Sequence, residues 1–207
     1  ALLMAAGAAG GALVSPVWLV MLWPALALAI VALGYATGNA GIFQKGSDGR
    51  VTLASGILLA PYRLGAHINV WAWTRRMPPV AQIAEGVFIG RFPTAAETDR
   101  FATVIDLTAE FARPATARTH WVSLPLLDLV PPDATVLAHA ADAIERARAS
   151  GPVLVCCALG FQRSAEAIIA WLLASGRASD RGEAKTLLER CGRRVHLRES
   201  AGSAGEP

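Results

Sequence analysis

Charged residues are missing from the first part of the chain: residues 1–44 contain no Asp, Glu, Lys, Arg or His, although the 207-residue sequence carries 19 basic and 16 acidic side chains. A transmembrane helix needs about 20 apolar residues, so this stretch is long enough for one tilted helix or for two helices joined by a tight turn. Candidate bends are Gly10-Gly11, Ser15-Pro16 and Trp23-Pro24. We expect residues 1–44 to form a transmembrane segment of one or two helices, with Trp18, Trp23 and Tyr35 at the level of the lipid headgroups.

A secretory signal peptide is the competing interpretation of this segment. Such a peptide begins with a basic region, which is absent here, and its apolar part is shorter. Basic residues follow the segment instead, at Lys45, Arg50, Arg63, Arg75 and Arg76. By the positive-inside rule they place the rest of the chain in the cytoplasm, which predicts location in the inner (cytoplasmic) membrane. Because the chain begins with Ala1 rather than Met, the existence of a preceding domain is left open.

Cysteine is also scarce, and no stretch is strongly basic. Three cysteines in no paired arrangement agree with a reducing compartment. The formal net charge is only +3, whereas proteins that bind nucleic acid concentrate Lys and Arg on one face or helix. We therefore expect no nucleic-acid partner.

Residues 45–79 are interpreted as a connector. After a turn at residues 47–50, apolar residues alternate with aromatic and basic side chains, a composition that suits a helix lying in the membrane interface with its cations toward the phosphates. These side chains are Tyr62, Arg63, His67, Trp71, Trp73, Arg75 and Arg76. An ordinary amphipathic helix packed on the following domain fits equally well. Pro78 and Pro79 end this element.

Residues 80–197 have the pattern of a compact α/β domain, in which strands alternate with helices around a central sheet. Strands are predicted at 87–91, 103–107, 121–127 and 152–156, and helices at 94–101, 132–151, 164–176 and 180–192. Thr94 and Glu97 have the spacing of a capping box at the first of these helices. The polar residues 198–207 are expected to form a disordered tail.

The chemistry is concentrated between Cys157 and Ser164, where a loop joins a predicted apolar strand to a predicted buried helix. Main-chain N–H groups of such a loop converge on one point and the helix dipole adds positive potential, so the loop is suited to bind an anion. Gly160 allows a conformation that other residues resist, and Arg163 can make a two-pronged contact with phosphate oxygens. A helix N-terminus and a nearby cation lower the pKa of a thiol, so Cys157 is predicted to be a nucleophile aimed at bound phosphate. A structural cysteine pair, with Arg163 in a surface ion pair, is the alternative.

The segment VCCALGFQRSA (155–165) resembles the His-Cys-x5-Arg-Ser signature of protein tyrosine and dual-specificity phosphatases. The resemblance covers about residues 80–197 and implies the cysteine-phosphatase fold and a two-step mechanism without metal or cofactor. By this resemblance Cys157 attacks phosphorus, Arg163 binds phosphate and the transition state, and Ser164 assists release of the thiolate. The loop residues implied to hold the substrate are Ala158, Leu159, Gly160, Phe161 and Gln162. Cys156 replaces the family's His, which puts the reactivity of Cys157 in question.

A phosphatase of this kind needs a proton donor for the leaving oxygen. Asp128 and Asp133 follow a predicted strand, at a distance before Cys157 similar to that of the acid in the family. Asp133 also begins a helix, where capping explains it without catalysis. Asp128 is therefore predicted to be the acid, whereas Asp106, at the end of a buried strand, and Cys191 are expected to be structural.

The loop carries no basic residue before Arg163, which favours a monophosphate ester over a polyphosphorylated inositol ring. The stretch VIDLTAEFARP (104–114) resembles a segment of the mitochondrial-type phosphatidylglycerophosphate phosphatases, with Glu110 and Phe111 at the matching places. Glu110 is predicted to contact substrate or to hold Arg163, and a solvated loop carboxylate is the alternative. Candidate ligands of a headgroup phosphate are Arg91, Arg113 and Arg118.

The chain as a whole resembles bacterial membrane-bound phosphatases in which a dual-specificity domain follows membrane helices. The resulting prediction is a membrane-anchored phosphatase whose substrate is a phosphorylated lipid or a phosphoprotein. Two other functions stay open. One is a catalytically weak phosphate-binding module, suggested by the missing His; the other is a thiol redox sensor in which Cys156 traps oxidised Cys157 as a vicinal disulfide.

Overall fold

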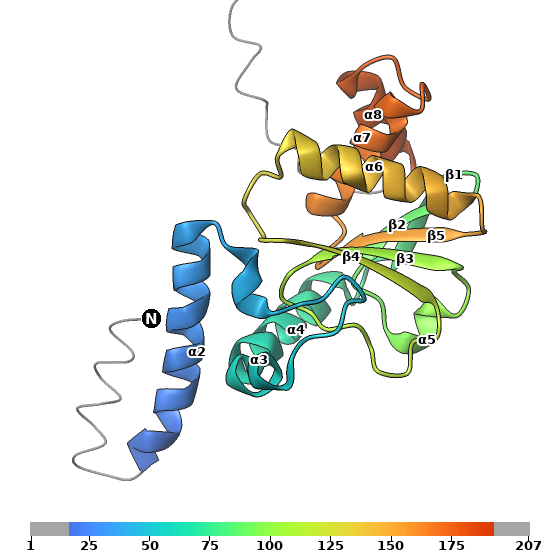
Figure 1. Cartoon of the computed structure of the whole chain (residues 1–207). Coiled ribbons are helices and arrows are strands. Elements are labelled where there is room, and N and C mark those ends of the chain that lie inside the picture. The colour runs from blue at the N-terminus through green and yellow to red at the C-terminus, as the bar shows by residue number, and fades with distance from the viewer. Residues whose placement is uncertain (1–16, 193–207) are drawn as a thin grey trace, which may run out of the picture.

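A computed structural model describes residues 17–192, and its centre is a five-stranded sheet in the order β1-β2-β5-β3-β4 (Figure 1). The strands are β1 (Val80–Ala84), β2 (Val87–Arg91), β3 (Thr103–Thr108), β4 (His120–Leu126) and β5 (Val153–Cys157). β1 pairs with β2 in the antiparallel sense, and the other neighbours are parallel. The carboxyl ends of β2 to β5 therefore meet at one edge of the sheet, where open α/β sheets bind their ligands.

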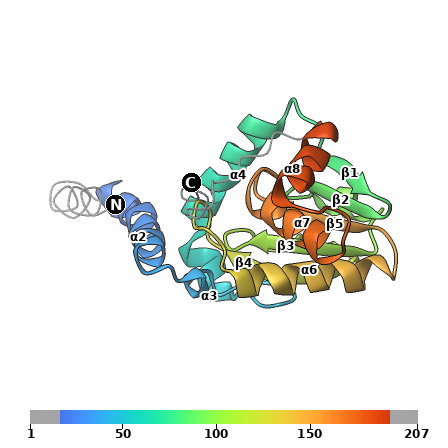
Figure 2. The ribbon, with the colours of Figure 1, turned by 90° about the horizontal axis from the view of Figure 1, so that it is seen from above.

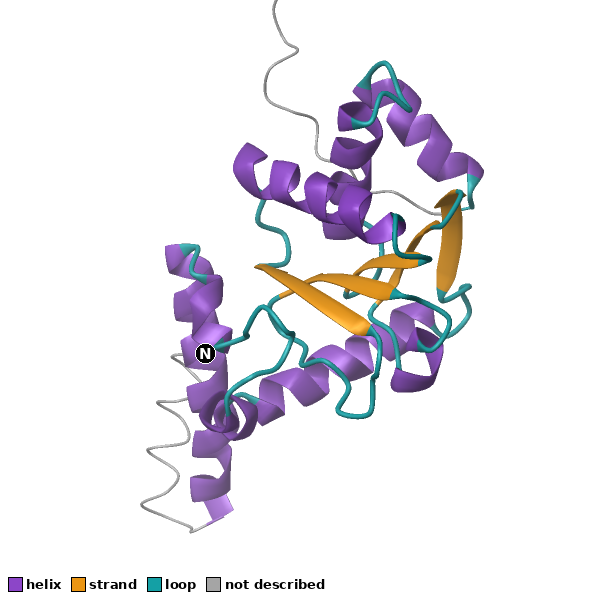
Figure 3. Ribbon diagram, turned by 45° about the vertical axis from the view of Figure 1, so that its right-hand side comes forward, coloured by secondary structure: helices purple, strands orange, loops and turns teal. Residues whose placement is uncertain are grey.

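Helices cover both faces of this sheet (Figures 1 and 2). On one face lie α6 (Ala134–Arg148), α7 (Arg163–Ala174) and α8 (Arg181–Arg190); on the other lie α4 (Ala60–Thr74) and α5 (Ala95–Thr98). Figure 3 shows the same layers, with the strands between two groups of helices. This arrangement confirms the predicted α/β fold class with a central sheet.

The central strand β5 explains how the sheet is buried and how its two cysteines are directed. All five of its residues are buried, as expected of a strand that is covered on both faces. Val155 and Cys157 belong to the core under α6 and α7, whereas Leu154 and Cys156 belong to the core on the opposite face. Because side chains of a strand alternate between faces, the two cysteine side chains point away from each other.

The apolar N-terminal segment forms one long helix, α2 (Val17–Thr37), followed by a short helix η1 (Ala40–Phe43). α2 continues through Pro24, so the chain does not turn back at Trp23-Pro24. Within the described residues, α2 is the one helix that is long and apolar enough to cross a membrane, with a mean hydropathy of 1.9 over Val20–Thr37. Residues 1–16, on which the choice between one and two helices depends, lie outside the described part.

α2 packs on the rest of the molecule by one side only. Ala27 and Val31 are buried with Phe43 and Leu59 in a cluster that also includes Ala109 and Leu127. Large apolar side chains of α2 are exposed at Val20, Met21, Leu26 and Leu33, and Leu26 and Leu33 lie on the side opposite Ala27 and Val31. Trp23, predicted to lie among headgroups, donates its Nε1 hydrogen to the carbonyl oxygens of Ile57 and Leu58, and Trp18 lies outside the part of the chain whose side chains are described.

The connector is a built part of the fold, and it contains α3 (Leu53–Leu58) and α4. The interfacial interpretation requires Arg63 to point toward lipid phosphates, but the structure places it elsewhere. It is buried, and its guanidinium donates to the carbonyl oxygens of Glu110 at 2.9 Å and of Ser55 at 2.8 Å. Large side chains on the outer side of α4 are nevertheless exposed, namely Leu64, Ile68, Trp71 and Trp73. α4 therefore packs on the domain and also presents an apolar stripe to its surroundings.

Most predicted elements are present, with boundaries shifted by a few residues. The capping box of Thr94 and Glu97 is confirmed, but α5 ends at Thr98, after which the Phe101 N–H bonds to the Thr98 carbonyl in a turn. The sequence does not predict β1, because its short run VAQIA has no clear alternation of apolar and polar residues. The predicted tail, 198–207, and the end of the predicted domain lie outside the described residues.

Candidate active site

Cys157 is the last residue of β5, and its side chain is only 3% exposed. Its Sγ accepts the main-chain N–H of Gly160 at 3.3 Å and lies 3.3 Å from the Ser164 Oγ. The following loop leads directly into α7, whose N-cap residue Gln162 makes no side-chain capping bond. The sulfur therefore lies where the amides of a helix N-terminus favour negative charge.

Gly160 fixes the shape of this loop. Its φ of +79° is in the left-handed region, and a Cβ at this position would lie 2.7 Å from both the carbonyl carbon and the oxygen of Gly90. The Phe92 N–H also bonds to the Ala158 carbonyl at 3.2 Å. The loop is thus held against the end of β2, and only glycine fits at its centre.

Arg163 begins α7 and is 1% exposed. Its two terminal nitrogens donate to the Glu110 carboxylate at 3.0 and 2.7 Å, and one of them also donates to the Leu126 carbonyl at 2.9 Å. Its Nε lies 3.3 Å from the Asp128 Oδ1, but the angle is not that of a hydrogen bond, so this buried donor has no acceptor. A buried guanidinium N–H without a hydrogen-bond acceptor is costly, and an oxygen atom of a bound anion would satisfy it.

Glu110 holds Arg163 in position. Its side chain is 6% exposed, so the interpretation as a solvated loop carboxylate is wrong. Burial alone raises the pKa of Glu110, but the Arg163 guanidinium outweighs burial and holds that pKa below its ordinary value. The two-pronged geometry is the one that Arg forms with carboxylates. The alternative prediction, that Glu110 contacts substrate directly, remains a prediction.

Asp128 is half-buried and lies beside the loop. Together with Cys157, Leu159, Phe161 and Gln162 it lines a cavity of about 200 Å³. The competing acid Asp133 instead caps α6, since its carboxylate accepts the Val136 N–H at 2.8 Å. The geometry therefore leaves Asp128 as the carboxylate next to the thiol.

Cys156 lies in a different environment from Cys157. Burial, with Asp106 and Cys157 nearby, raises the pKa of the Cys156 thiol well above its ordinary value. A vicinal disulfide would require the two Cβ atoms to approach to about 3.8 Å, which the alternating directions of a strand prevent. The arrangement opposes the redox-sensor interpretation and agrees with a buried structural role for Cys156.

Lys45 and Asp106 form a buried ion pair, with neither side chain exposed. Lys45 also donates to the Thr108 carbonyl at 2.7 Å, and Asp106 accepts from the indole of Trp121 at 3.2 Å. Asp106 is therefore structural, as predicted. Lys45 is not at a membrane surface, and the sequence gives no sign of its partner 61 residues away.

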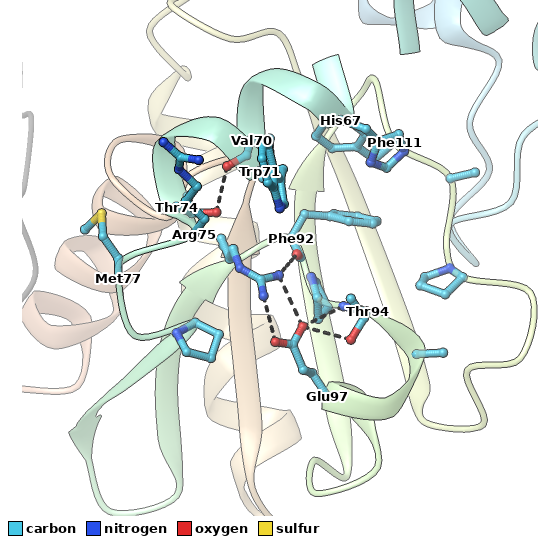
Figure 4. Close-up of a pocket in the computed structure, with 16 residues that line it drawn as sticks. His67, Val70, Trp71, Thr74, Arg75, Met77, Phe92, Thr94, Glu97 and Phe111 are labelled. Carbon is cyan, nitrogen blue, oxygen red and sulfur yellow. Dashed lines mark hydrogen bonds and ion pairs between the residues drawn. The ribbon is translucent and has the colours of Figure 1, made fainter. Parts of the chain in front are cut away.

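Two of the three arginines predicted as headgroup ligands have partners of their own within the domain, although Arg91 is the register partner of Cys157 on the neighbouring strand. Arg91 pairs with Glu97 at 2.7 Å, Arg113 stacks on Trp121 and donates to the Ala117 carbonyl, and Arg118 is exposed. Arg91 and Glu97 line the largest cavity described, of about 710 Å³. Figure 4 shows Glu97 across this cavity from Trp71 of α4 and from Arg75, the residue after α4. The cavity contains neither Cys157 nor Arg163, so it is not where the predicted chemistry occurs.

Solved structures of phosphatases have this fold. The active form of Tk-PTP superposes with a TM-score of 0.51 and 25% identity, over 57% of this chain and 88% of its own. PTPMT1 in complex with PI(5)P superposes with a TM-score of 0.53 and 19% identity, over 59% of this chain and 89% of its own. A point variant of human DUSP28 superposes with a TM-score of 0.52 and 21% identity, over 58% of this chain and 87% of its own. No protein-family model and no curated protein matches the sequence.

The chain has the fold of the dual-specificity and protein tyrosine phosphatases. Members of this group are phosphoric monoester hydrolases. The superposed part corresponds to a phosphatase domain, and α2 with the connector adds residues that sequence reasoning did not place near its site. Among these are Tyr35 and Tyr62, which line a groove together with Asp128 and lie near Glu110 and Arg163. The sequence did not indicate these two tyrosines, because they lie far from residues 155–165 and belong to no recognised motif.

Proposed function

We propose that the chain is a membrane-anchored, cysteine-dependent phosphatase that hydrolyses phosphomonoesters through a cysteinyl-phosphate intermediate. The observation that carries the proposal is the buried Arg163 Nε, which has no hydrogen-bond acceptor although it lies in the same site as the Cys157 sulfur. A phosphate oxygen would supply the acceptor, and phosphate is the anion for which the loop amides and the helix dipole are suited.

In the first step, an electron pair of the ionised Cys157 sulfur attacks phosphorus and the bond between phosphorus and the ester oxygen breaks. Asp128 gives its proton to the departing alkoxide, which leaves as an alcohol. Arg163 and the loop amides stabilise the charge on the transferring phosphoryl oxygens. The loop residues from Ala158 to Gln162 carry no charge, which favours one phosphate group over several.

In the second step, water attacks the cysteinyl-phosphate. The carboxylate of Asp128 takes the proton of the water, the bond between phosphorus and sulfur breaks, and inorganic phosphate leaves. The Ser164 hydroxyl, 3.3 Å from the sulfur, donates a hydrogen bond to the departing thiolate. Metal and cofactor play no part in this scheme.

Membrane anchoring rests on the length and apolar exposed side of α2. The exposed basic residues Arg50, Arg75 and Arg76 follow it, which favours a catalytic domain on the cytoplasmic side. Either a lipid phosphate or a phosphoprotein side chain satisfies the chemistry of the loop.

The test uses the full chain in detergent with p-nitrophenyl phosphate as substrate. Cys157→Ser is expected to lower kcat by at least about a thousand-fold, since loss of a nucleophile removes the covalent route. Cys191→Ser, far from the loop on the last helix, is the matched control and should keep wild-type activity. Acid-quenched wild-type enzyme should carry phosphate on Cys157. Activity that survives Cys157→Ser would overturn the proposal, and a wild-type chain that binds phosphate without turnover would favour the phosphate-binding module.

A further inference from the structure

A groove of about 340 Å³ lies between α2 and α4 and reaches the catalytic loop. Its walls include Leu28 and Tyr35 of α2 and Tyr62, Gly65, Ala66 and Asn69 of α4. At one end it is bounded by Asp128 and Ala158. Asp128 also lines the cavity that contains Cys157, so the groove and the catalytic cavity meet at this carboxylate.

The walls of the groove are largely apolar, and Asn69, Tyr35 and Tyr62 add uncharged polar groups. Asp128 is its one charged lining residue in the described part of the chain. Tyr35 and Tyr62 both line the groove, and burial raises the pKa of Tyr62, so its hydroxyl stays neutral. An occupant with a polar group at one end and hydrocarbon at the other matches this distribution.

The outer rims of the groove connect it to surfaces suited to a bilayer. α2 presents Met21, Leu26 and Leu33 on its exposed side, and α4 presents Leu64 and Ile68. A hydrocarbon chain that moved from a bilayer along α2 into the groove would exchange one apolar environment for another, at little cost in hydration. A phosphopeptide would instead bring main-chain polar groups into a groove whose walls offer few partners for them.

We propose that this groove binds the hydrocarbon portion of a membrane lipid whose headgroup ends in a phosphomonoester. The inference rests on the proposed phosphatase function and names the substrate class for the same site. Tyr35 and Tyr62 lie at the boundary between headgroup and hydrocarbon, and the terminal phosphate reaches Cys157 past Asp128.

Substitution of Gly65 by a larger residue would fill the groove. A Cβ at Gly65 would meet no atom within 4 Å, and glycine inside a helix is unfavourable, so a larger residue there costs α4 nothing. Gly56 of α3 has the same open surroundings and does not line the groove, so Gly56→Trp is the matched control.

The experiment measures kcat/KM of the full chain in mixed detergent micelles with phosphatidylglycerophosphate and phosphatidic acid, and in parallel with p-nitrophenyl phosphate and a phosphotyrosine peptide. For Gly65→Trp, the ratio of lipid to p-nitrophenyl phosphate hydrolysis should fall about ten-fold, the factor associated with two methylene groups that are no longer buried. For Gly56→Trp the ratio should stay within about two-fold of the wild type.

Each arm of this experiment has a distinct meaning. If the wild type hydrolyses p-nitrophenyl phosphate but neither lipid, or if Gly65→Trp leaves the ratio unchanged, the groove proposal is overturned while the phosphatase function stands. If Gly65→Trp weakens peptide hydrolysis as much as lipid hydrolysis, the groove serves phosphoprotein and the lipid assignment is wrong. If the wild type hydrolyses none of the four substrates, it is the proposed function that fails.

Discussion

Arg163 contacts several of the groups that surround the catalytic loop. It contacts the Glu110 carboxylate after β3, and the Leu126 carbonyl and the Asp128 carboxylate at the end of β4, so it joins two segments. A fully buried cation needs such partners, because an uncompensated charge in the interior costs several kcal/mol. The residue that receives phosphate in the proposed mechanism is thus also a support for the loops around it.

Glu110→Gln tests this support. Breaking a buried pair by neutralising one partner costs about 3 kcal/mol or more, so thermal unfolding of the full chain in detergent at pH 7 should shift to a clearly lower temperature. The pKa of Glu110 is lower in the folded state than its ordinary value. Its stabilising effect is therefore complete above the unfolded value of about 4.3 and is lost as pH falls through the lower folded value.

The difference in unfolding temperature between the wild type and Glu110→Gln should accordingly shrink below about pH 4, because the wild-type carboxyl then becomes protonated. Glu189→Gln, an exposed acid on α8, is the control and should show little difference at either pH. Equal unfolding temperatures of Glu110→Gln and wild type at pH 7 would show that the pair contributes nothing to stability.

Local motifs made some residues of the site predictable and others not. Cys157, Arg163 and Ser164 lie within eight residues, and the sequence pattern around them was sufficient to bring them together. Asp128 followed from its place after a strand. Arg63 and Lys45, by contrast, find partners 47 and 61 residues away, and nothing in their own surroundings indicates burial, since most basic residues are exposed.

At the scale of elements, the loop between β5 and α7 depends on one backbone position. In Gly160→Ala, the left-handed φ costs about 1 kcal/mol, and the new Cβ would press on the Gly90 backbone at 2.7 Å. The loop must then shift, and displacement of about 1 Å at a catalytic site can cost a hundred-fold in rate. Turnover of p-nitrophenyl phosphate by the purified chain should fall by about that factor.

Gly176→Ala separates the two contributions to this effect. Gly176 also has a left-handed φ, of +67°, but a Cβ there would meet nothing within 4 Å. This variant should lose about 1 kcal/mol of stability and keep its turnover. If both variants lost activity equally, backbone strain alone, rather than the close approach to Gly90, would explain the result.

Elements with a clear period were predictable from the sequence, and short ones were not. The buried strand at 103–108 and the helices α6 and α7 have long apolar patterns with distinct end signals. β1 owes its existence to pairing with β2 across a turn at Gly86, which is a tertiary effect. The composition of the connector was compatible with two locations, and only packing shows that Arg63 faces inward.

For the whole molecule, the proposed membrane anchoring depends on α2. Leu26 and Leu33 are 51% and 60% exposed on the side away from the domain, so their replacement leaves the packing of α2 intact. Each Arg within a membrane helix costs about 2.5 kcal/mol of insertion. In the Leu26→Arg, Leu33→Arg double variant, the fraction of protein that stays with membranes after alkaline carbonate extraction should fall sharply.

Leu26→Phe with Leu33→Phe is the control and should remain in the membrane fraction. If the arginine variant resisted extraction as well as the wild type, α2 would not be the anchor. If the wild type itself were extracted completely, α2 would be a surface helix of the domain.

The contacts of Lys45 limit how far the central sheet can move relative to α2. Lys45 follows the end of α2 by only eight residues, and its ammonium group is locked to Asp106 and Thr108 of the central sheet. No long flexible linker therefore separates α2 from the domain that contains Cys157. With α2 embedded in a bilayer, the Cys157 thiol would be held at a fixed distance from the membrane surface. Phosphate groups at other distances from that surface would not be hydrolysed, whatever their shape.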